Sequence, residues 1–237
     1  MRCWRCLCSS MAITFTVAGG GEQFSYTPEA LIIAGFTARN RTVVEHHMEE
    51  LRAIGVPIPA EIPTFYPVPA SLLIADPAIE VTTPESSGEV EPVLLARGDE
   101  WFIALGSDHT ARDMEAIDIG RSKAACPKIV TTDLWRYAEV KPHWDQLTLR
   151  CWTVQNGARV PYQHGTCADI MQLEELVRVM RARKVTAAAN FVMPMGTLPL
   201  LDGKFVFAKR FELELEDPVL DRRLTLGYDV TVYNPAD

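Results

Sequence analysis

The apolar residues of this chain fall in short runs separated by turn-forming residues, and this pattern constrains the fold more than any other feature. Ile13 to Val17 alternates apolar residues with threonine and ends at Gly19-Gly20-Gly21, which predicts a strand followed by a hairpin turn. Ala30 to Phe36 is a compact apolar run that is typical of a buried strand. Gln146 to Val154 alternates again and is followed by Asn156-Gly157, a strong hairpin signal. This succession predicts a domain rich in β-structure.

Further strands are expected in the middle and at the end of the chain. Pro92 to Ala96 and Glu100 to Gly106 predict two strands that are joined at Arg97-Gly98-Asp99. The C-terminal part predicts three more, at Lys204 to Phe207, Arg210 to Glu216 and Leu224 to Val232. In the second of these, apolar and charged residues alternate, so we expect one face of the strand to be wet.

Helical spacing is confined to a few stretches. Ala168 to Arg183 is the best amphipathic helix, and Thr42 to Ile54 also carries apolar residues at helical spacing. The polar stretch Ala111 to Lys123 is interpreted as one helix. Pro57 to Pro69 contains five prolines and predicts an extended connector, and Thr82 to Gly88 predicts a turn or an exposed loop. Many strands with two or three helices indicate an α+β fold that is mainly β.

Length and charge exclude several classes of protein. A chain of 237 residues that is 48% hydrophobic can bury a core without disulfides. The net charge of −8 argues against a general nucleic-acid binder, which would show a basic stripe. No run reaches the roughly 18–20 apolar residues that a membrane span requires. Met1 to Ser10 has no apolar region of a secretory signal, so we expect a cytoplasmic protein.

The N-terminal residues stand apart from the rest of the chain. We interpret residues 1–12 as a disordered tail or a mis-assigned start, and residues 13–237 as a single domain. Cys3, Cys6 and Cys8 crowd this tail, but a second ligand pair at zinc-finger spacing is missing, so we do not assign a zinc site to them.

The sharpest local motif is Glu89-Val90-Glu91. Carboxylates at positions i and i+2 of a strand point to the same side, where like charges repel unless water or a cation separates them. Taken alone, such a pair is most often a solvated strand face. Here an apolar run follows at once, and Asp108 ends the next predicted strand, so that a hairpin would return it beside the pair. Three hard oxygen ligands suit Mg²⁺ or Mn²⁺.

A second group of titratable residues lies in His46-His47-Met48-Glu49-Glu50. His46 with Glu49, and His47 with Glu50, are spaced three apart and share a helix face. A carboxylate beside an imidazole orients it and raises its basicity, as general-base catalysis requires. The alternative is an exposed helix face with ordinary polar residues, and the segment by itself favours that alternative.

Two weaker candidates complete the search of the sequence. Lys123 can hold a substrate carboxylate or stabilise an enolate, although a single lysine is usually a surface residue. Cys126 lacks a thiolate-activating setting in the sequence. Gly196-Thr197 lies between apolar runs, where the backbone can approach a ligand closely or simply turn.

The order of these motifs resembles that of the fumarylacetoacetate hydrolase superfamily over roughly Ala30 to Val232. Ala34-Gly35-Phe36 and the histidine-containing helix are similar to the opening strand of that family and its Asp-His-x-x-Glu stretch, and the proline-rich run from Gly55 to Phe65 resembles the next motif. The remaining matches are Glu89-Val90-Glu91, the run Ser107-Asp108-His109-Thr110-Ala111-Arg112-Asp113, Lys123 with Cys126-Pro127, and Gly196-Thr197. The short stretch between Glu91 and Asp108, Ser107 in place of asparagine, and Gly-Thr-Leu-Pro in place of Gly-Thr-Pro mark a divergent, uncharacterised branch.

The resemblance implies a mixed β-roll flanked by a few helices, in a homodimer. It implies metal ligation by Glu89, Glu91 and Asp108, a catalytic pair His47 and Glu50, and Lys123 beside the developing negative charge. Arg112, Gly196 and Thr197 are then expected to bind substrate. A one-residue shift would make the pair His46 and Glu49 instead, and the sequence leaves that choice open.

Three functions are compatible with these residues. The first is a Mg²⁺- or Mn²⁺-dependent hydrolase, or a lyase or decarboxylase, acting on a small 2-oxo acid or diketo acid through a metal-chelated enolate. The second is a non-catalytic protein of the same fold that binds a small anion or a partner. The third is a structural β-rich protein whose carboxylates are only surface groups. The first is our hypothesis.

Overall fold

The structure, a computed structural model, describes residues 12–42, 45, 48–49, 52 and 58–234. Its largest sheet has ten strands and is mixed, with the order β2-β1-β12-β9-β8-β15-β3-β4 and with β11 and β5 attached beside β9. The strands of this sheet are β1 (Ile13–Val17), β2 (Gln23–Tyr26), β3 (Ala30–Gly35), β4 (Thr64–Val68), β5 (Leu73–Ile74), β8 (Val90–Arg97), β9 (Glu100–Asp108), β11 (Lys128–Val130), β12 (Asp133–Arg136) and β15 (Asn190–Pro194).

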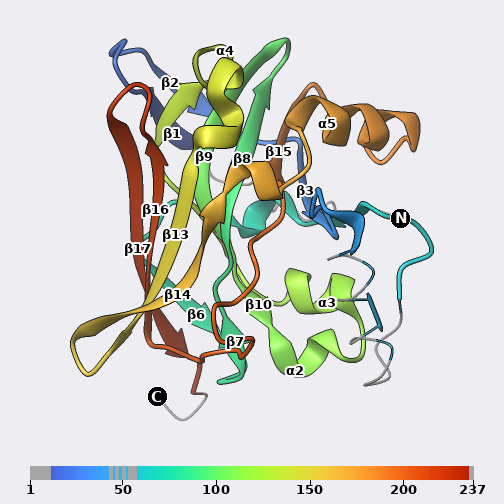
Figure 1. Cartoon of the computed structure of the whole chain (residues 1–237), viewed down its shortest axis with the longest axis vertical. Helices are drawn as coiled ribbons and strands as arrows, with labels where there is room; N and C mark the ends of the chain where they lie inside the picture. The colour runs from blue at the N-terminus through green and yellow to red at the C-terminus, as the bar shows by residue number, and fades with distance from the viewer. Residues whose placement is uncertain (1–11, 43–44, 46–47, 50–51, 53–57, 235–237) are drawn as a thin grey trace, which may run out of the picture.

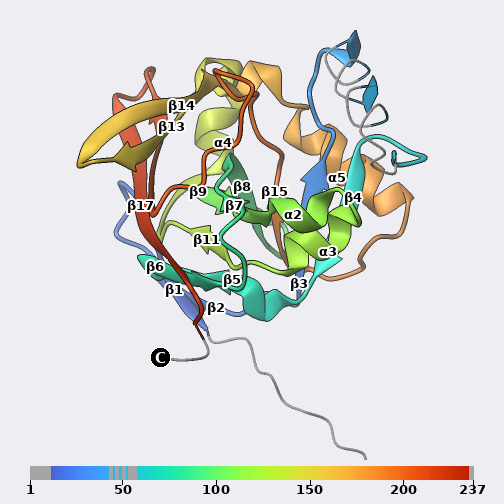
Figure 2. The same ribbon diagram turned by 90° about the horizontal axis from the view of Figure 1, so that it is seen from below.

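A second, five-stranded sheet lies along one side of β8, β9 and β15 (Figures 1 and 2). Its order is β14-β13-β16-β17-β6, and its strands are β6 (Ala78–Val81), β13 (Thr148–Gln155), β14 (Ala158–Thr166), β16 (Arg210–Asp217) and β17 (Arg222–Val232). A small ribbon pairs β7 (Ser86–Ser87) with β10 (Thr110–Ala111).

Short helices flank the sheets. The α-helices are α2 (Arg112–Glu115), α3 (Ile119–Ala124), α4 (Tyr137–Val140) and α5 (Leu173–Ala182), and the 3-10 helices are η1 (Ala70–Leu72), η2 (Lys141–Gln146) and η3 (Cys167–Asp169). Helices α2 and α3 lie beside β10, below α5 in Figure 1. Among the described residues, no helix is both long enough and apolar enough to cross a membrane.

The large sheet curls on itself, because strands from its two ends supply residues to the same hydrophobic cluster. Phe15 and Tyr26 come from β1 and β2 at one end of the strand order, and Val68 comes from β4 at the other end, yet all three belong to one buried cluster. The opposite face of the sheet supplies Leu94 and Ile103 to a second cluster, which the five-stranded sheet and α5 complete. Strand β8 is therefore buried on both faces, and this burial explains why its sequence is a nearly continuous apolar run.

The α+β, mainly β fold that the sequence predicts is confirmed. Strands β1, β3, β13, β16 and β17 lie in segments where the sequence predicts strands, and the hairpin of β8 and β9 turns at Gly98 and Asp99. Asn156 and Gly157 both have positive φ angles, 51° and 79°, as a tight two-residue hairpin turn requires. The described residues of the helix predicted at Thr42 to Ile54, which are Thr42, Glu45, Met48, Glu49 and Arg52, are helical.

Several local expectations are wrong. Lys204 to Phe207 forms no strand, and the alternation of its phenylalanines reflects a half-exposed segment between β15 and β16. Ala111 to Lys123 is not one helix, because the side chain of Asp118 accepts a hydrogen bond from the backbone N–H of Arg121 and starts α3. Thr82 to Gly88 is a turn or an exposed loop only in its first part, where Thr82, Pro84 and Glu85 are exposed, since both residues of β7 are buried.

Two boundaries also differ from the expected ones. The amphipathic helix begins at Leu173 rather than at Ala168, because η3 and an extended residue precede it. The proline-rich connector contains strand β4, in which Pro67 is tolerated because β4 ends the strand order of the sheet.

Candidate metal centre

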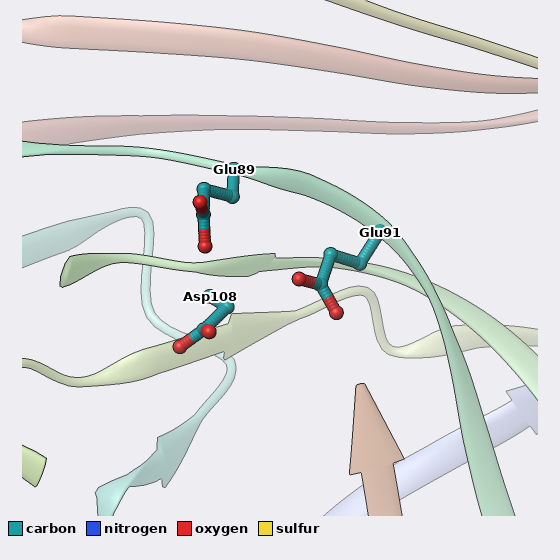
Figure 3. Close-up of side chains that lie close together, drawn as sticks. All are labelled: Glu89, Glu91 and Asp108. Atoms are coloured by element: carbon teal, nitrogen blue, oxygen red, sulfur yellow. The ribbon is translucent and has the colours of Figure 1, made fainter. Parts of the chain in front are cut away.

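The β8–β9 hairpin brings the three predicted ligands together. Its register places Val90 opposite Ser107, and the backbone N–H of Asp108 donates to the carbonyl oxygen of Glu89 at 3.1 Å. One carboxylate oxygen from each of Glu89, Glu91 and Asp108 lies within 4.8 Å of the others. Figure 3 shows the three side chains converging on one space. The hairpin therefore brings Asp108 beside Glu89 and Glu91, as the sequence predicts.

Glu91 is the most isolated of the three acids. Its side chain is buried, with 1% of the residue exposed, and one oxygen accepts a hydrogen bond from the backbone N–H of Gly196 at 2.8 Å. Among the described residues, no cation forms an ion pair with it. Burial raises the pKa of Glu91 well above its usual value, and the negative charges of Asp108 and Glu89 raise it further.

Asp108 is held between two lysines. Lys123 on α3 binds one of its oxygens, and Lys128 on β11 binds the other at 2.7 Å. Burial by itself would raise the pKa of Asp108, but the two ammonium groups outweigh that effect and lower the pKa to about 2. Asp108 is therefore ionised under ordinary conditions.

Lys128 is a residue that the sequence reasoning missed. Its ammonium group also donates to the carbonyl oxygen of His109 at 2.6 Å, and its side chain is 1% exposed. A lysine at the head of the apolar run Ile129-Val130 was the available signal, because a charge at that position in a buried strand needs a partner.

Lys123 and Glu89 form the open side of the cluster. The Lys123 ammonium lies 3.4 Å from a Glu89 oxygen, and the two side chains keep 8% and 13% of their surface exposed, whereas Asp108 keeps none. Burial would lower the pKa of Lys123, but the surrounding carboxylates, Asp108 first, raise it above its usual value. A small ligand reaching the carboxylates from this side would meet a charged ammonium group.

Arg112 is buried and contacts one of the three carboxylates, that of Glu89. Its guanidinium lies 3.0 Å from Glu89, binds Glu115 at 2.8 Å and donates to the Ser87 hydroxyl at 2.8 Å. The ring of Phe205 covers it at 4.1 Å. The contacts of Arg112 are thus to protein groups, and they orient Glu89.

Gly196 and Thr197 also contact the ligand strand. Gly196 has a φ of +104°, and a Cβ atom there would lie 1.8 Å from the Thr37 hydroxyl oxygen. The Thr197 hydroxyl donates to the carbonyl oxygen of Val90 at 2.8 Å. Of these two residues, which are expected to bind substrate, Gly196 binds the carboxylate of Glu91 and Thr197 binds the backbone of Val90. The remaining predicted pair, His47 and Glu50, lies outside the described residues.

The donor set fits a hard divalent cation. Three carboxylates with converging oxygens are the ligands that Mg²⁺ and Mn²⁺ prefer. Glu91 adds a buried acid without a cation partner, an arrangement that costs free energy unless a positive charge is supplied. Glu89, Glu91 and Asp108 would hold such an ion.

Comparisons with known proteins give the fold a family. A family model described as "Protein of unknown function (DUF2848)" matches residues 34–228. A comparison with curated proteins found no match. Among solved structures, a candidate fumarylpyruvate hydrolase from Burkholderia cenocepacia is similar, with a TM-score of 0.63, 17% identity, and coverage of 99% of this chain and 97% of that one.

Two further solved structures contain ligands. A 2-keto-3-deoxy-D-arabinonate dehydratase complexed with magnesium and 2,5-dioxopentanoate has a TM-score of 0.60 and 15% identity, and the match covers 90% of this chain and 77% of that one. A maleylpyruvate hydrolase from Sphingobium sp. SYK-6, in complex with manganese(II) and pyruvate, has a TM-score of 0.55 and 16% identity, with 90% and 75% covered. The chain therefore belongs to the DUF2848 family, and it has the fold of the fumarylacetoacetate hydrolase-like proteins.

Proposed function

We propose that this protein is an enzyme that uses Mg²⁺ or Mn²⁺ to hydrolyse a C–C bond in a small 2-oxo acid or diketo acid. The observation that carries the proposal is the buried Glu91, which has no cation partner among the described residues and lies with Glu89 and Asp108 around one space. The proteins of this fold that were solved with magnesium and 2,5-dioxopentanoate, or with manganese and pyruvate, support a metal-bound 2-oxo acid.

A bound divalent cation would act as a Lewis acid toward the 2-oxo and carboxylate oxygens of the substrate. Lys123 lies on the open side of the cluster, so that its ammonium group would stabilise negative charge developing on the substrate. Arg112 would keep Glu89 oriented, and Gly196 would keep Glu91 oriented. His47, assisted by Glu50, is proposed as the base that activates water.

A lyase or decarboxylase reaction is the variant of this proposal that the comparisons keep open. A dehydratase and a hydrolase share this fold, and both are described with a metal and a 2-oxo acid. The reaction type therefore depends on groups around the substrate rather than on the three carboxylates.

Thermal unfolding with Mg²⁺ or Mn²⁺, with and without oxalate, tests the proposal. Oxalate has the two adjacent carboxylate oxygens of an enolised 2-oxo acid. A ligand at about 100 times its Kd stabilises a protein by about 2.7 kcal/mol, or roughly 5–10 °C in a domain of this size. We expect oxalate to stabilise the wild type only when metal is present, and a screen of diketo acids to give metal-dependent turnover.

Glu91→Gln gives the sharpest comparison. It should raise the Tm of the metal-free protein at pH values above 4.5, because it removes the free-energy cost of burying an acid whose pKa is raised by burial and by two neighbouring carboxylates, and it should abolish the metal shift. Asp217→Asn is the matched control: Asp217 is also buried, but it is paired with His143 at 2.9 Å and Arg222 at 3.1 Å. The control should lower the Tm and keep the metal shift. An equal metal shift in Glu91→Gln would exclude this metal site.

A further inference from the structure

Residues 86–91, the ligand segment, carry two of the three carboxylates, and side chains from other elements hold them in place. The hydroxyl of Ser86 lies 3.0 Å from Nε2 of His109, and the Ser87 hydroxyl accepts from Arg112. Gly88 and Glu89 lie between β7 and β8, outside both strands. The positions of Glu89 and Glu91 thus depend on contacts beyond the strand ladder.

Tyr228, on β17 of the five-stranded sheet, supplies one group of these contacts. Its hydroxyl lies 2.8 Å from the Ser107 hydroxyl and 3.0 Å from Nδ1 of His109, the two residues that flank Asp108. The Ser107 hydroxyl in turn accepts a hydrogen bond from the backbone N–H of Glu89 at 3.2 Å. One buried hydroxyl group therefore links the backbones of two carboxylate ligands.

The same hydroxyl also packs against the residue that precedes Glu89. A Cβ atom on Gly88 would lie 2.3 Å from the Tyr228 oxygen, so the backbone can come this close only at glycine. The ring of Tyr228 is fully buried and stacks on Phe211, with centroids 5.6 Å apart and planes at 19°. The hydroxyl is thus fixed by a ring that cannot move freely.

Gln163, on β14 of the same sheet, supplies the second group of contacts. Its side-chain oxygen accepts from the backbone N–H of Val90 at 3.0 Å, and its amide nitrogen donates to the Thr197 hydroxyl at 2.8 Å. That hydroxyl donates to the carbonyl oxygen of Val90. Both backbone polar groups of the residue between Glu89 and Glu91 are therefore bound, directly or through Thr197, by a glutamine that is 1% exposed.

We propose that Tyr228 and Gln163 are positioning residues of the metal centre, through which the five-stranded sheet sets the spacing of Glu89, Glu91 and Asp108. The inference rests on the proposed metal-dependent function. Neither residue contacts a carboxylate group, so their effect passes through the backbone of the ligand segment and through Ser107 and His109. Groups that orient metal ligands in this way typically change metal affinity by about 10- to 100-fold when removed.

Titration of the metal-free protein with Mn²⁺, with free Mn²⁺ read from its electron paramagnetic resonance signal, measures this effect without enzyme turnover. Tyr228→Phe keeps the stacked ring and removes only the hydroxyl. Gln163→Met keeps the side-chain length and removes the amide contacts with Val90 and Thr197, together with the one to the carbonyl oxygen of Leu198. We expect each variant to bind Mn²⁺ at least about tenfold more weakly than the wild type. The thermal unfolding of each metal-free variant is measured alongside.

Tyr26→Phe is the matched control. Tyr26 is also buried, and its hydroxyl donates one hydrogen bond to the carbonyl oxygen of Ala96 at 2.8 Å, near the end of β8 that is far from Glu91. It should lower the Tm and leave the Mn²⁺ affinity unchanged. Wild-type affinity in folded Tyr228→Phe or Gln163→Met would overturn the inference alone, whereas absence of Mn²⁺ binding in the wild type would overturn the proposed function as well.

Discussion

At the scale of single residues, the candidate site contains groups whose burial or backbone conformation costs free energy. Glu91 is a buried acid beside two other acids, and Gly196, which donates to it, has a backbone conformation that favours glycine. Such features persist only when the surrounding structure compensates for them, and they are concentrated at functional sites. The backbone conformation of Gly196 and the buried acid Glu91 therefore both indicate a functional site at the same place.

Gly196→Ala should destabilise the protein by about 2–5 kcal/mol. The positive φ costs roughly 1–2 kcal/mol for a residue with a Cβ atom, and displacement of Thr37 adds a packing cost of about 1–3 kcal/mol. The free energy of unfolding from urea denaturation measures the effect.

Gly157→Ala separates the two contributions. Gly157 also has a positive φ, but a Cβ atom there meets nothing within 4 Å. The substitution should cost only about 1–2 kcal/mol. An equal loss in both variants would contradict the proposed clash with Thr37.

At the scale of elements, the short helix α3 matters because it carries Lys123 to Asp108. The helix has only six residues, too few to be stable by propensity alone, and its start is fixed by the side chain of Asp118, which accepts from the N–H of Arg121 at 3.0 Å. The hydrogen bond accepted by the Asp118 side chain thus fixes the start of the helix that carries Lys123.

Asp118→Ala should lower the free energy of unfolding by about 1 kcal/mol, because an N-cap hydrogen bond is lost. Asp118→Asn should remain close to the wild type, since asparagine is an equally good cap. Urea denaturation of both variants distinguishes the cap from the charge: if Asn is as damaging as Ala, the carboxylate charge, and not the cap, stabilises α3.

At the scale of the whole molecule, two sheets meet around one core, and the metal centre lies where the β8–β9 hairpin approaches the five-stranded sheet. Tyr228 and Phe211 belong to the core cluster that joins the sheets. We therefore expect stability and the proposed metal binding to be coupled, because residues that close the core also contact the ligand segment.

This coupling predicts a pH dependence of the metal-induced stabilisation. Because the folded-state pKa of Glu91 is raised above its usual 4.5, its contribution to stability is present below that value and is lost as the pH rises toward the folded-state pKa. The Asp108 pKa of about 2 keeps that group ionised throughout this window. A bound cation favours the ionised Glu91, so metal binding offsets the loss.

The increase in Tm caused by a fixed excess of Mg²⁺ should therefore grow as the pH rises above 4.5, the usual pKa of a glutamate. Thermal scans at pH values above this one measure it, and Glu91→Gln should show no such growth. A metal shift that falls with rising pH would show that Glu91 is not the group that exchanges a proton for the cation.

The sequence by itself determined the elements whose signals are local. Alternation or apolar runs identified strands β1, β3, β8, β9, β13, β16 and β17, and Asn156-Gly157 identified a hairpin. The spacing of Glu89, Glu91 and Asp108 identified the candidate metal ligands, because a hairpin with a short turn must bring its two ends together. The local signals failed for Lys204 to Phe207, where an apolar run predicts a strand but the segment has no regular structure and its two phenylalanines are exposed.

Only the tertiary structure decided how the site is held. The contact of Lys128 with Asp108, and those of Tyr228 and Gln163 with the ligand segment, join residues that are 20 or more positions apart or lie in different sheets. The periodicity of the sequence does not predict such contacts. The contact of Lys128 follows from the pairing of β11 with β9, and those of Tyr228 and Gln163 follow from the packing of the five-stranded sheet against the large one. The sequence specifies the chemical groups, and packing sets the distances between them.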